Sequence, residues 1–248
     1  MKSRLAKKMW KVMAMVLTMS FVMVTTVYAA QLPQGTGPSL RGKTAGSSVY
    51  FGRFEQDGNA ANGAEPIEWI VLANDGTKAL LLSKNILENL SYLHTYENIT
   101  WERSDVRSWM NGTFYNGAFN DMEKTAVLTV TNTNPASDDF YGGAGLPGGD
   151  DTVDKVFALS AYEAKLYLGA GLSDWNARMQ ACPTTYAMMK GCWTNGGSGR
   201  GFWWLRTPGN AYGNFTSVVQ DHGGVVSHVG VSAGEGARPA IWVANNGF

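Results

Sequence analysis

The chain has 248 residues, of which 44% are hydrophobic and 16% charged, and its formal net charge at pH 7 is zero. Five of its 20 basic residues and none of its 20 acidic residues lie in the first 29 positions, so the remainder carries five excess negative charges. This acidic balance argues against nucleic acid as a partner, because phosphates call for a basic face. It argues equally against binding to an anionic membrane surface.

The N-terminal segment has the pattern of an export signal. A positively charged leader precedes an apolar run from Val12 to Val27, and Val27-Tyr28-Ala29 supplies the small residues that a signal peptidase needs. The alternative is a retained membrane anchor, but the run of about 16 residues is shorter than the ~20 that span a bilayer. We therefore expect a signal peptide over residues 1–29 and a protein that is secreted or held at the cell surface, with no stable membrane insertion after cleavage.

Residues 30–48 have few large apolar groups and are predicted to be a flexible linker. A single domain is expected over residues 49–248, because that length suits one core. Its first part has the pattern of a β-meander, including an Asp75-Gly76 step of the kind favoured in tight hairpins. The predicted strands are residues 49–54, 66–73 and 78–83.

Helical signals fill the middle of the chain. Apolar residues at helical spacing predict a helix over residues 104–111. Two capping-box patterns, over residues 120–123 and 160–163, predict the starts of two further helices. The second follows a predicted strand over residues 155–159, and Gly169 is the expected C-terminal cap of its helix.

The C-terminal half is harder to assign to regular elements. Residues 132–154 are predicted to be a long loop rich in Gly, Pro and Asp. From about Met179 the chain is expected to be irregular until a last strand over residues 239–243. Strands at both ends with helices between them give the fold class α+β.

Two tryptophan clusters, each beside an arginine, bracket the C-terminal part. They are Phe202-Trp203-Trp204-Leu205-Arg206-Thr207-Pro208-Gly209 and Arg238-Pro239-Ala240-Ile241-Trp242. Further blocks precede them: Val49-Tyr50-Phe51-Gly52-Arg53-Phe54-Glu55-Gln56-Asp57, Glu65-Pro66-Ile67-Glu68-Trp69, Leu80-Leu81-Leu82-Ser83, Trp101 with Arg107-Ser108-Trp109-Met110-Asn111, and Asp154-Lys155-Val156-Phe157-Ala158-Leu159-Ser160. In these motifs and their order the chain resembles a large family of secreted bacterial domains of unknown function with a C-type-lectin-like fold.

The resemblance implies a fold in which the N- and C-terminal strands pair and two or more helices flank them. It also implies a long irregular C-terminal region that forms the upper face. The function implied is binding of an unknown protein or glycan, and we expect a monomer. Because Arg206 and Arg238 lie inside the motifs, we expect them to hold the framework together with Trp204 and Trp242, rather than to contact an anionic ligand.

The recognition surface is expected between residues 210 and 235. Tyr, Ser, Asn and Gly in this stretch are types that give adaptable binding surfaces at low ordering cost. The expected ligand contacts are Tyr212, Asn214, His222, Ser227, His228 and Trp203. Adjacent tryptophans in a strand point to opposite faces, so we expect one of Trp203 and Trp204 to be buried and the other partly exposed.

No metal or cofactor is expected at this surface. His222 and His228 lack a third ligand at a suitable spacing. Glu65-Pro66 continues with Ile67, and Asp174-Trp175-Asn176 is only superficially similar to the Trp-Asn-Asp of sugar-binding C-type lectins, so calcium-dependent sugar binding is not expected. A structural calcium loop is the alternative to a solvated acidic loop for Asp138, Asp139, Asp150, Asp151 and Asp154.

The two cysteines, Cys182 and Cys192, are predicted to form a disulfide, because an even pair in an exported chain usually does. A metal or redox pair is the alternative. The chain has no nucleophile elbow, zincin helix, P-loop or dinucleotide fingerprint. An oxidase-type enzyme, as in the formylglycine-generating enzymes of related fold, remains an alternative, as does a structural module of a surface assembly.

The composition of residues 210–234 also fits diversification by a retroelement that randomises adenines in Asn codons. Most residues in the segment are reachable by such changes. Gln220 and Glu235 are not reachable, so the hypothesis requires both to be fixed. An ordinary glycine-rich loop has the same composition, and the two interpretations stay open.

Overall fold

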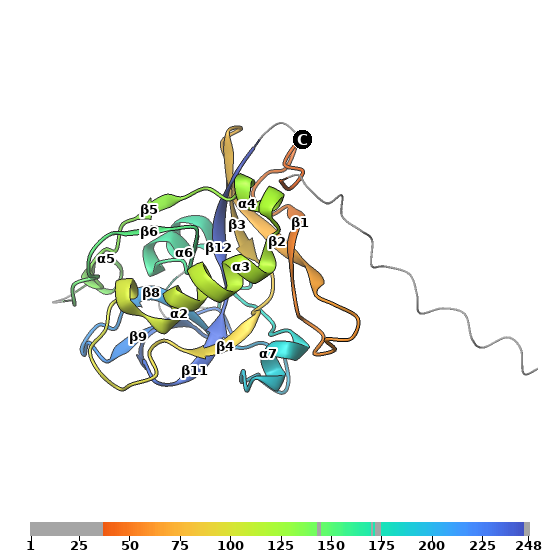
Figure 1. The fold of residues 1–248 in the computed structure, drawn as a ribbon. Helices are drawn as coiled ribbons and strands as arrows, with labels where there is room; N and C mark the ends of the chain where they lie inside the picture. Colours follow the sequence, from red (N-terminus) through yellow and green to blue (C-terminus); the bar gives the residue numbers. More distant parts are fainter. Residues whose placement is uncertain (1–36, 143–144, 170, 172–174, 246–248) are drawn as a thin grey trace, which may run out of the picture. The chain divides into compact units, whose positions relative to one another are not determined.

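The computed structural model describes residues 37–142, 145–169, 171 and 175–245, which belong to one unit that begins at Leu32. The predicted signal peptide and the first part of the predicted linker lie outside the described residues. The fold is α+β and consists mostly of strands (Figure 1).

The strands are β1 (Ser48–Phe54), β2 (Glu65–Asn74), β3 (Lys78–Ser83), β4 (Glu88–Ser91), β5 (Val130–Asn132), β6 (Thr152–Asp154), β7 (Val156–Phe157), β8 (Trp203–Pro208), β9 (Phe215–Val219), β10 (Val225–Gly230), β11 (Gly234–Ala237) and β12 (Ala240–Ala244). The helices are η1 (Trp101–Arg103), α2 (Asp105–Trp109), η2 (Met110–Phe114), α3 (Tyr115–Ala118), α4 (Asp121–Ala126), α5 (Asp138–Tyr141), α6 (Ala161–Leu168) and α7 (Thr185–Met189).

The first sheet has the order β1-β2-β3-β12-β7. The predicted meander is confirmed, because β1, β2 and β3 pair in succession and their bounds agree with the prediction to within one residue. The turn between β2 and β3 is held by Asp75, whose Oδ1 accepts hydrogen bonds from the backbone nitrogens of Thr77 and Lys78.

The expected pairing of the N- and C-terminal strands is wrong. β1 and β12 lie in the same sheet, but β12 lies beside β3 (Figure 1) and pairs with β3 on one side and β7 on the other. The difference in burial between β3 and β1 explains why β12 pairs with β3. The Leu80-Leu81-Leu82 run of β3 is buried on both faces and needs apolar neighbours, whereas Ser48 and Tyr50 of β1 are exposed.

The second sheet has the order β10-β9-β8-β11-β4, and β11 runs parallel to β8. The expectation of a long irregular C-terminal region is therefore wrong, since residues 203–237 contribute four of its strands. The β9–β10 hairpin pairs Val219 with Val225 and Val218 with Val226. These β-branched pairs stabilise the hairpin despite the glycine-rich composition of the segment.

The helical predictions hold with one change. Ser104 caps α2 by accepting a hydrogen bond from Arg107 N, and the helix continues past the predicted end through η2 and α3. Both capping boxes are present. Gly169 ends α6 in the left-handed conformation, with φ 74°.

The linker prediction is wrong for its described part. Leu40 is fully buried, and Asn74 Nδ2 donates to the carbonyl oxygens of Leu40 and Lys43. Residues 37–47 therefore pack on the domain, because one large apolar side chain with matched backbone partners is enough to attach a short segment.

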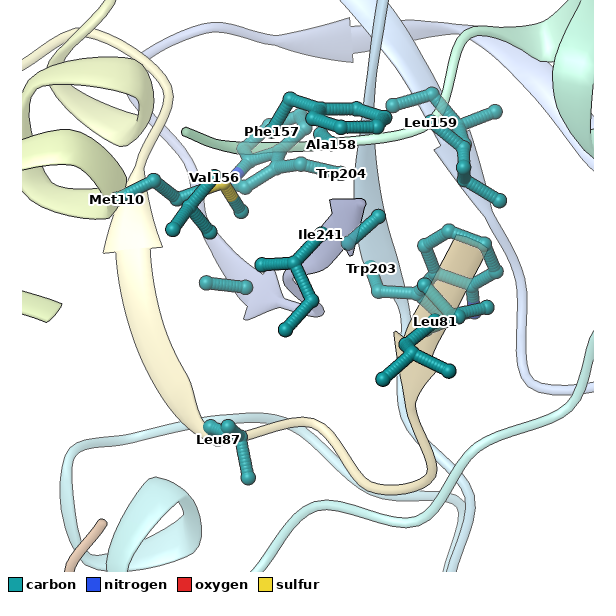
Figure 2. Packing of buried hydrophobic residues seen from close by; sticks show 14 of the residues in the cluster. Leu81, Leu87, Met110, Val156, Phe157, Ala158, Leu159, Trp203, Trp204 and Ile241 are labelled. Carbon is teal, nitrogen blue, oxygen red and sulfur yellow. The ribbon is translucent and has the colours of Figure 1, made fainter. Parts of the chain in front are cut away.

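Trp203 and Trp204 both lie in the core (Figure 2) and neither is exposed, so the expectation that one would be partly exposed is wrong. Alternation does put the two rings on opposite faces of β8, but β8 is a central strand and both of its faces are covered. The Trp204 ring meets Tyr92 at 5.5 Å between centroids. Trp203 packs beneath Arg238, whose Cζ lies 4.8 Å from the ring centroid.

Candidate functional site

The framework arginines are buried and make hydrogen bonds to the chain around them. Arg238 is 1% exposed, and its guanidinium donates to three carbonyl oxygens, those of Ser83, Lys84 and Met179. Met179 O also accepts from Trp203 Nε1 at 3.0 Å. This placement ties the start of β12 to the end of β3 and to the segment before α7, which is what a framework role requires.

Arg206 connects a different set of elements. Its guanidinium donates to Asn134 Oδ1, to the carbonyls of Thr133 and Ala158, and to Glu163 Oε2. The Glu163 carboxylate also accepts from the backbone N–H of the α6 N-cap residue. The Arg206 guanidinium therefore fixes the start of α6, the residue after β7 and the segment after β5 against β8.

Asp154 is a third framework residue, which the sequence placed in a motif without indicating its contacts. Its carboxylate is buried and accepts five side-chain hydrogen bonds. The donors are Trp101, Arg107, Asn111, Asn132 and Thr152. Asp154 thus joins the paired strands β5 and β6 to η1, α2 and η2. Its carboxylate is used for these internal hydrogen bonds rather than for binding a cation.

Among the described residues, the other acids of the predicted calcium loop form no group of three whose oxygens lie within 4.8 Å of one another. Asp138 and Asp139 begin α5, while Asp151 Oδ1 accepts from Asn134 N. Within the described ranges, the only three carboxylates whose oxygens come within 4.8 Å of one another are Glu55, Asp57 and Glu65. These three carboxylates accept hydrogen bonds from the backbone nitrogens of Gln56, Gly58 and Asn59 in the connection between β1 and β2.

The predicted recognition segment does not form one surface. The five residues of β9 separate the residues before this strand, at the first end of the β9–β10 hairpin, from those in the turn after it, at the second end. At the usual rise per strand residue this separation is ~17 Å. Tyr212 and Asn214 lie before β9, and His222 lies in the turn after it. Ser227 is half-buried and His228 exposed, both on the edge strand β10. Trp203 is fully buried, so its predicted role as a ligand contact is wrong.

An aromatic surface forms at the first end. Tyr212 is 66% exposed and its ring lies 5.8 Å from that of Phe215. Phe215 also contacts Tyr96, which is 56% exposed, with the two rings edge to face at 6.1 Å. The loop before η1 is held here by the hydrogen bond from Ile99 N to Gly213 O. We call Tyr96, Tyr212 and Phe215 the tyrosine surface.

At the second end, three segments meet at the turn between β9 and β10. His222 contacts the ring of Trp175, and Asp221 Oδ2 accepts a hydrogen bond from Asn195 Nδ2 at 2.7 Å. Arg200 lies over the same tryptophan ring. Sequence reasoning missed Tyr96, Trp175 and Arg200, because all three lie outside residues 210–235 and reach the two ends only through the fold.

The family model described as a domain of unknown function, DUF6273, matches residues 76–245. The chain belongs to this family. No curated protein matches the chain, and no solved structure does. The matched DUF6273 region contains both ends of the β9–β10 hairpin and all three framework residues, but it begins after β2.

The disulfide prediction for this DUF6273 domain is wrong, because Cys182 and Cys192 are both free. Ala181, Cys182 and Pro183 alternate between buried and exposed, which turns the Cys182 side chain outward. Cys192 is buried, and its thiol points toward its own neighbour's carbonyl, Trp193 O, at 3.9 Å. Burial raises the pKa of the Cys192 thiol to about 12.

Two carboxyl groups lie near that thiol on the β4–β11 ladder. Glu235 pairs with Leu90 in register, so Glu235 and Glu88 share one face of the sheet. Glu235 Oε2 is buried without a hydrogen-bond partner, and burial raises the pKa of this carboxyl to about 7. Burial also raises the pKa of Glu88. Neither carboxyl was indicated by the sequence.

Among the described residues, every helix is too short or too polar to cross a membrane.

Proposed function

We propose that this DUF6273 protein is an exported binding module with a C-type-lectin-like fold, and that it recognises a protein or glycan rather than transforming a substrate. The leader pattern of residues 1–29 supports export. The α+β architecture supports the fold, with its first and last strands in one sheet and its later strands bearing exposed connections.

The observation that carries the binding function is the tyrosine surface. Two tyrosine rings more than half exposed, joined through Phe215, form an apolar area that also carries two hydroxyl groups. Tyrosine contributes large contact area at low entropic cost, which is why it is enriched in recognition surfaces. The framework beneath is rigid, since Thr216 and Ser217 of β9 are buried and bonded to the carbonyls of Thr207 and Pro208.

An oxidase-type activity based on the cysteine pair receives less support. The thiolate is the reactive form of cysteine. With its pKa raised to about 12, the Cys192 thiol is almost entirely protonated near neutral pH. Cys182 is exposed and stands apart from it, with no bond between the two sulfurs.

The test is binding of the labelled protein to a glycan array and to a panel of displayed cell-surface proteins. We expect at least one specific partner, and we expect the double variant Tyr96→Ala/Tyr212→Ala to weaken that binding at least about tenfold while the melting temperature stays unchanged. Tyr162→Ala is the matched control, because this α6 tyrosine is 53% exposed. Equal loss of binding in the control, or full binding by the double variant, would rule out the tyrosine surface.

A further inference from the structure

We propose that Trp175, Arg200 and His222 form a second binding site, for a pyranose sugar that carries a carboxylate. The site lies at the opposite end of the β9–β10 hairpin from the tyrosine surface, and so goes beyond the function proposed above. We call it the tryptophan site.

The tryptophan site is built from three segments that hold one another in place. Asn176 N and Gln180 Nε2 both donate to His222 O, each at 3.0 Å. The contact is close enough to require glycine at 223, which has φ 94° and whose added Cβ would lie 2.1 Å from Asn176 O. The backbone that bears Trp175 is thus attached directly to the hairpin turn.

The third segment brings the arginine. Asn195 N donates to Arg200 O at 2.8 Å and closes a turn over residues 195–200. The Asn195 side chain then binds this turn to the hairpin through Asp221. Separate chain segments that converge by specific hydrogen bonds are what positions side chains in a binding site.

Trp175 offers the apolar part of the site. Its side chain is 71% exposed, the largest exposure among the described large apolar residues. His222 stacks against it with centroids 6.4 Å apart and planes inclined by 30°. The exposed part of the indole is an apolar surface that an aliphatic C–H face of a pyranose ring would cover, with the release of water.

Arg200 offers the charge. Its guanidinium carbon lies 5.9 Å from the Trp175 ring, and its side chain is half-buried. Arg206 and Arg238 each donate at least three side-chain hydrogen bonds, but among the described residues the Arg200 side chain meets no hydrogen-bond acceptor and no carboxylate within 4.0 Å. A guanidinium partly withdrawn from water, with five free donors in a fork, matches a carboxylate in two-point geometry.

The neighbouring carboxylate of Asp221 does not serve as the partner of the Arg200 guanidinium. Among the described residues of the three converging segments, Asp221 is the one carboxylate, and it is already bonded to Asn195 at 2.7 Å and faces His222 Nδ1 at 3.4 Å. It therefore orients the histidine ring and the 195–200 turn. The ligand's carboxylate is expected at Arg200, with its ring on Trp175.

The experiment uses two matched pairs of sugars as probes, measured by calorimetry on the whole exported protein. Trigalacturonate is compared with galactotriose, and an oligosaccharide of glucuronate with its glucose counterpart. Within at least one pair the acidic sugar should bind about tenfold more tightly or better, because hydrogen bonds between charged groups are the strong ones. Its affinity should fall as salt is raised.

Variants separate the two parts of the site. Arg200→Gln should abolish the preference for the acidic sugar, and Trp175→Ala should abolish binding of both members of a pair. Arg103→Gln, at an arginine 69% exposed elsewhere, should change nothing. Equal affinity for acidic and neutral sugars, no binding of either pair, or unchanged binding by Arg200→Gln would overturn the proposal. The double variant of the tyrosine surface should bind the acidic sugar normally, so failure at one site is distinguishable from failure at the other.

Discussion

Arginine side chains in this protein differ in what their guanidinium groups meet. Arg238 is buried and donates to three carbonyl oxygens, whereas Arg103 is 69% exposed and lies 4.0 Å from a carboxylate oxygen of Glu102. Removing Arg238 takes one donor from each of these carbonyl oxygens, of which Met179 O keeps its bond from Trp203 Nε1, so Arg238→Ala should cost about 1–3 kcal/mol of unfolding free energy. Thermal or denaturant unfolding measures this, with Arg103→Ala as a control that should stay within about 0.5 kcal/mol. An unchanged melting temperature in Arg238→Ala would show that Arg238 is not a framework residue.

Glu235 gives the stability of the protein a specific dependence on pH. Burial raises its pKa in the folded state to about 7, above the ordinary value of 4.5. The folded protein therefore holds this proton more tightly than the unfolded chain, and the stability that it contributes is full below pH 4.5 and lost as the pH rises through 7. We expect the unfolding free energy to fall by on the order of 2 kcal/mol between pH 5 and pH 8.

Glu235→Gln should remove most of that dependence. Glu88 shares the same face and has a pKa shifted in the same direction, so a smaller slope of the same sign should remain. Cys192, which also faces Glu235, has its pKa raised to about 12 and stays neutral across this range. Denaturant unfolding at several pH values measures the slope, with the exposed Glu97→Gln as control. A slope that persists unaltered in Glu235→Gln would exclude this carboxyl as its source.

The two thiols should differ in reactivity in a way that a disulfide does not allow. Cys182 is exposed and Cys192 buried. In protein that has not been reduced, a thiol reagent should label one cysteine in the native state and two after denaturation, identified by peptide mass. If denatured protein showed no reactive thiol, the disulfide expected from the sequence would be restored.

Among the elements, β1 depends on a single glycine. Gly52 has φ 67° at the register shift between Tyr50 and Arg53, and an added Cβ would lie 2.8 Å from Ala118 O. Gly52→Ala should therefore cost about 1–3 kcal/mol. Gly117→Ala is a matched control in α3, where a Cβ would meet nothing within 4 Å, and should stabilise the protein by about 0.5–1 kcal/mol. Equal melting temperatures for the two variants would contradict this account of β1.

At the same scale, the sequence predicted those elements whose signals are local. The meander followed from apolar runs around Asp75-Gly76, and both capping boxes followed from side chains that bond within four residues. The β9–β10 hairpin had a local signal too, two Val-Val pairs flanking Gln-Asp-His-Gly-Gly, but the many glycines around it favoured an irregular interpretation. Burial of both Trp203 and Trp204 depends on β8 being central, which no spacing within the strand reveals.

For the whole molecule, the sheet is larger than the family match. The matched region begins at residue 76 and omits β1 and β2, yet Trp69 of β2 is fully buried and donates to Phe51 O of β1. A chain of residues 76–248 should thus fail to melt cooperatively, because it exposes the buried edge of β3. A chain of residues 37–248 should melt like the whole protein. Circular dichroism on heating distinguishes the two, and a cooperative transition in the shorter chain would show that β1 and β2 are dispensable.

The sequence indicated one residue at each candidate site but not the residues that contact it. Tyr212 and His222 were found because their segment has the composition of a recognition surface. Tyr96 lies 116 residues before Tyr212, and Trp175 and Arg200 lie 47 and 22 residues before His222. Isolated exposed aromatics or arginines carry no signal of their own until the fold places them.

The position of β12 has a consequence for how the molecule is made. This strand lies inside the first sheet, between β3 and β7, and the bond from Arg238 to Ser83 O spans 155 residues of chain. During synthesis or translocation, β3 is therefore present long before β12. Until β12 is made, the edge of β3 with which it pairs, in the Leu80-Leu81-Leu82 run, has no partner strand. Loop closure of that length makes assembly slow, and the waiting edge invites association with other chains. We therefore expect the unfinished chain to need a chaperone that prevents aggregation until β12 has been made. Premature termination before residue 240 should yield insoluble protein rather than a smaller folded one.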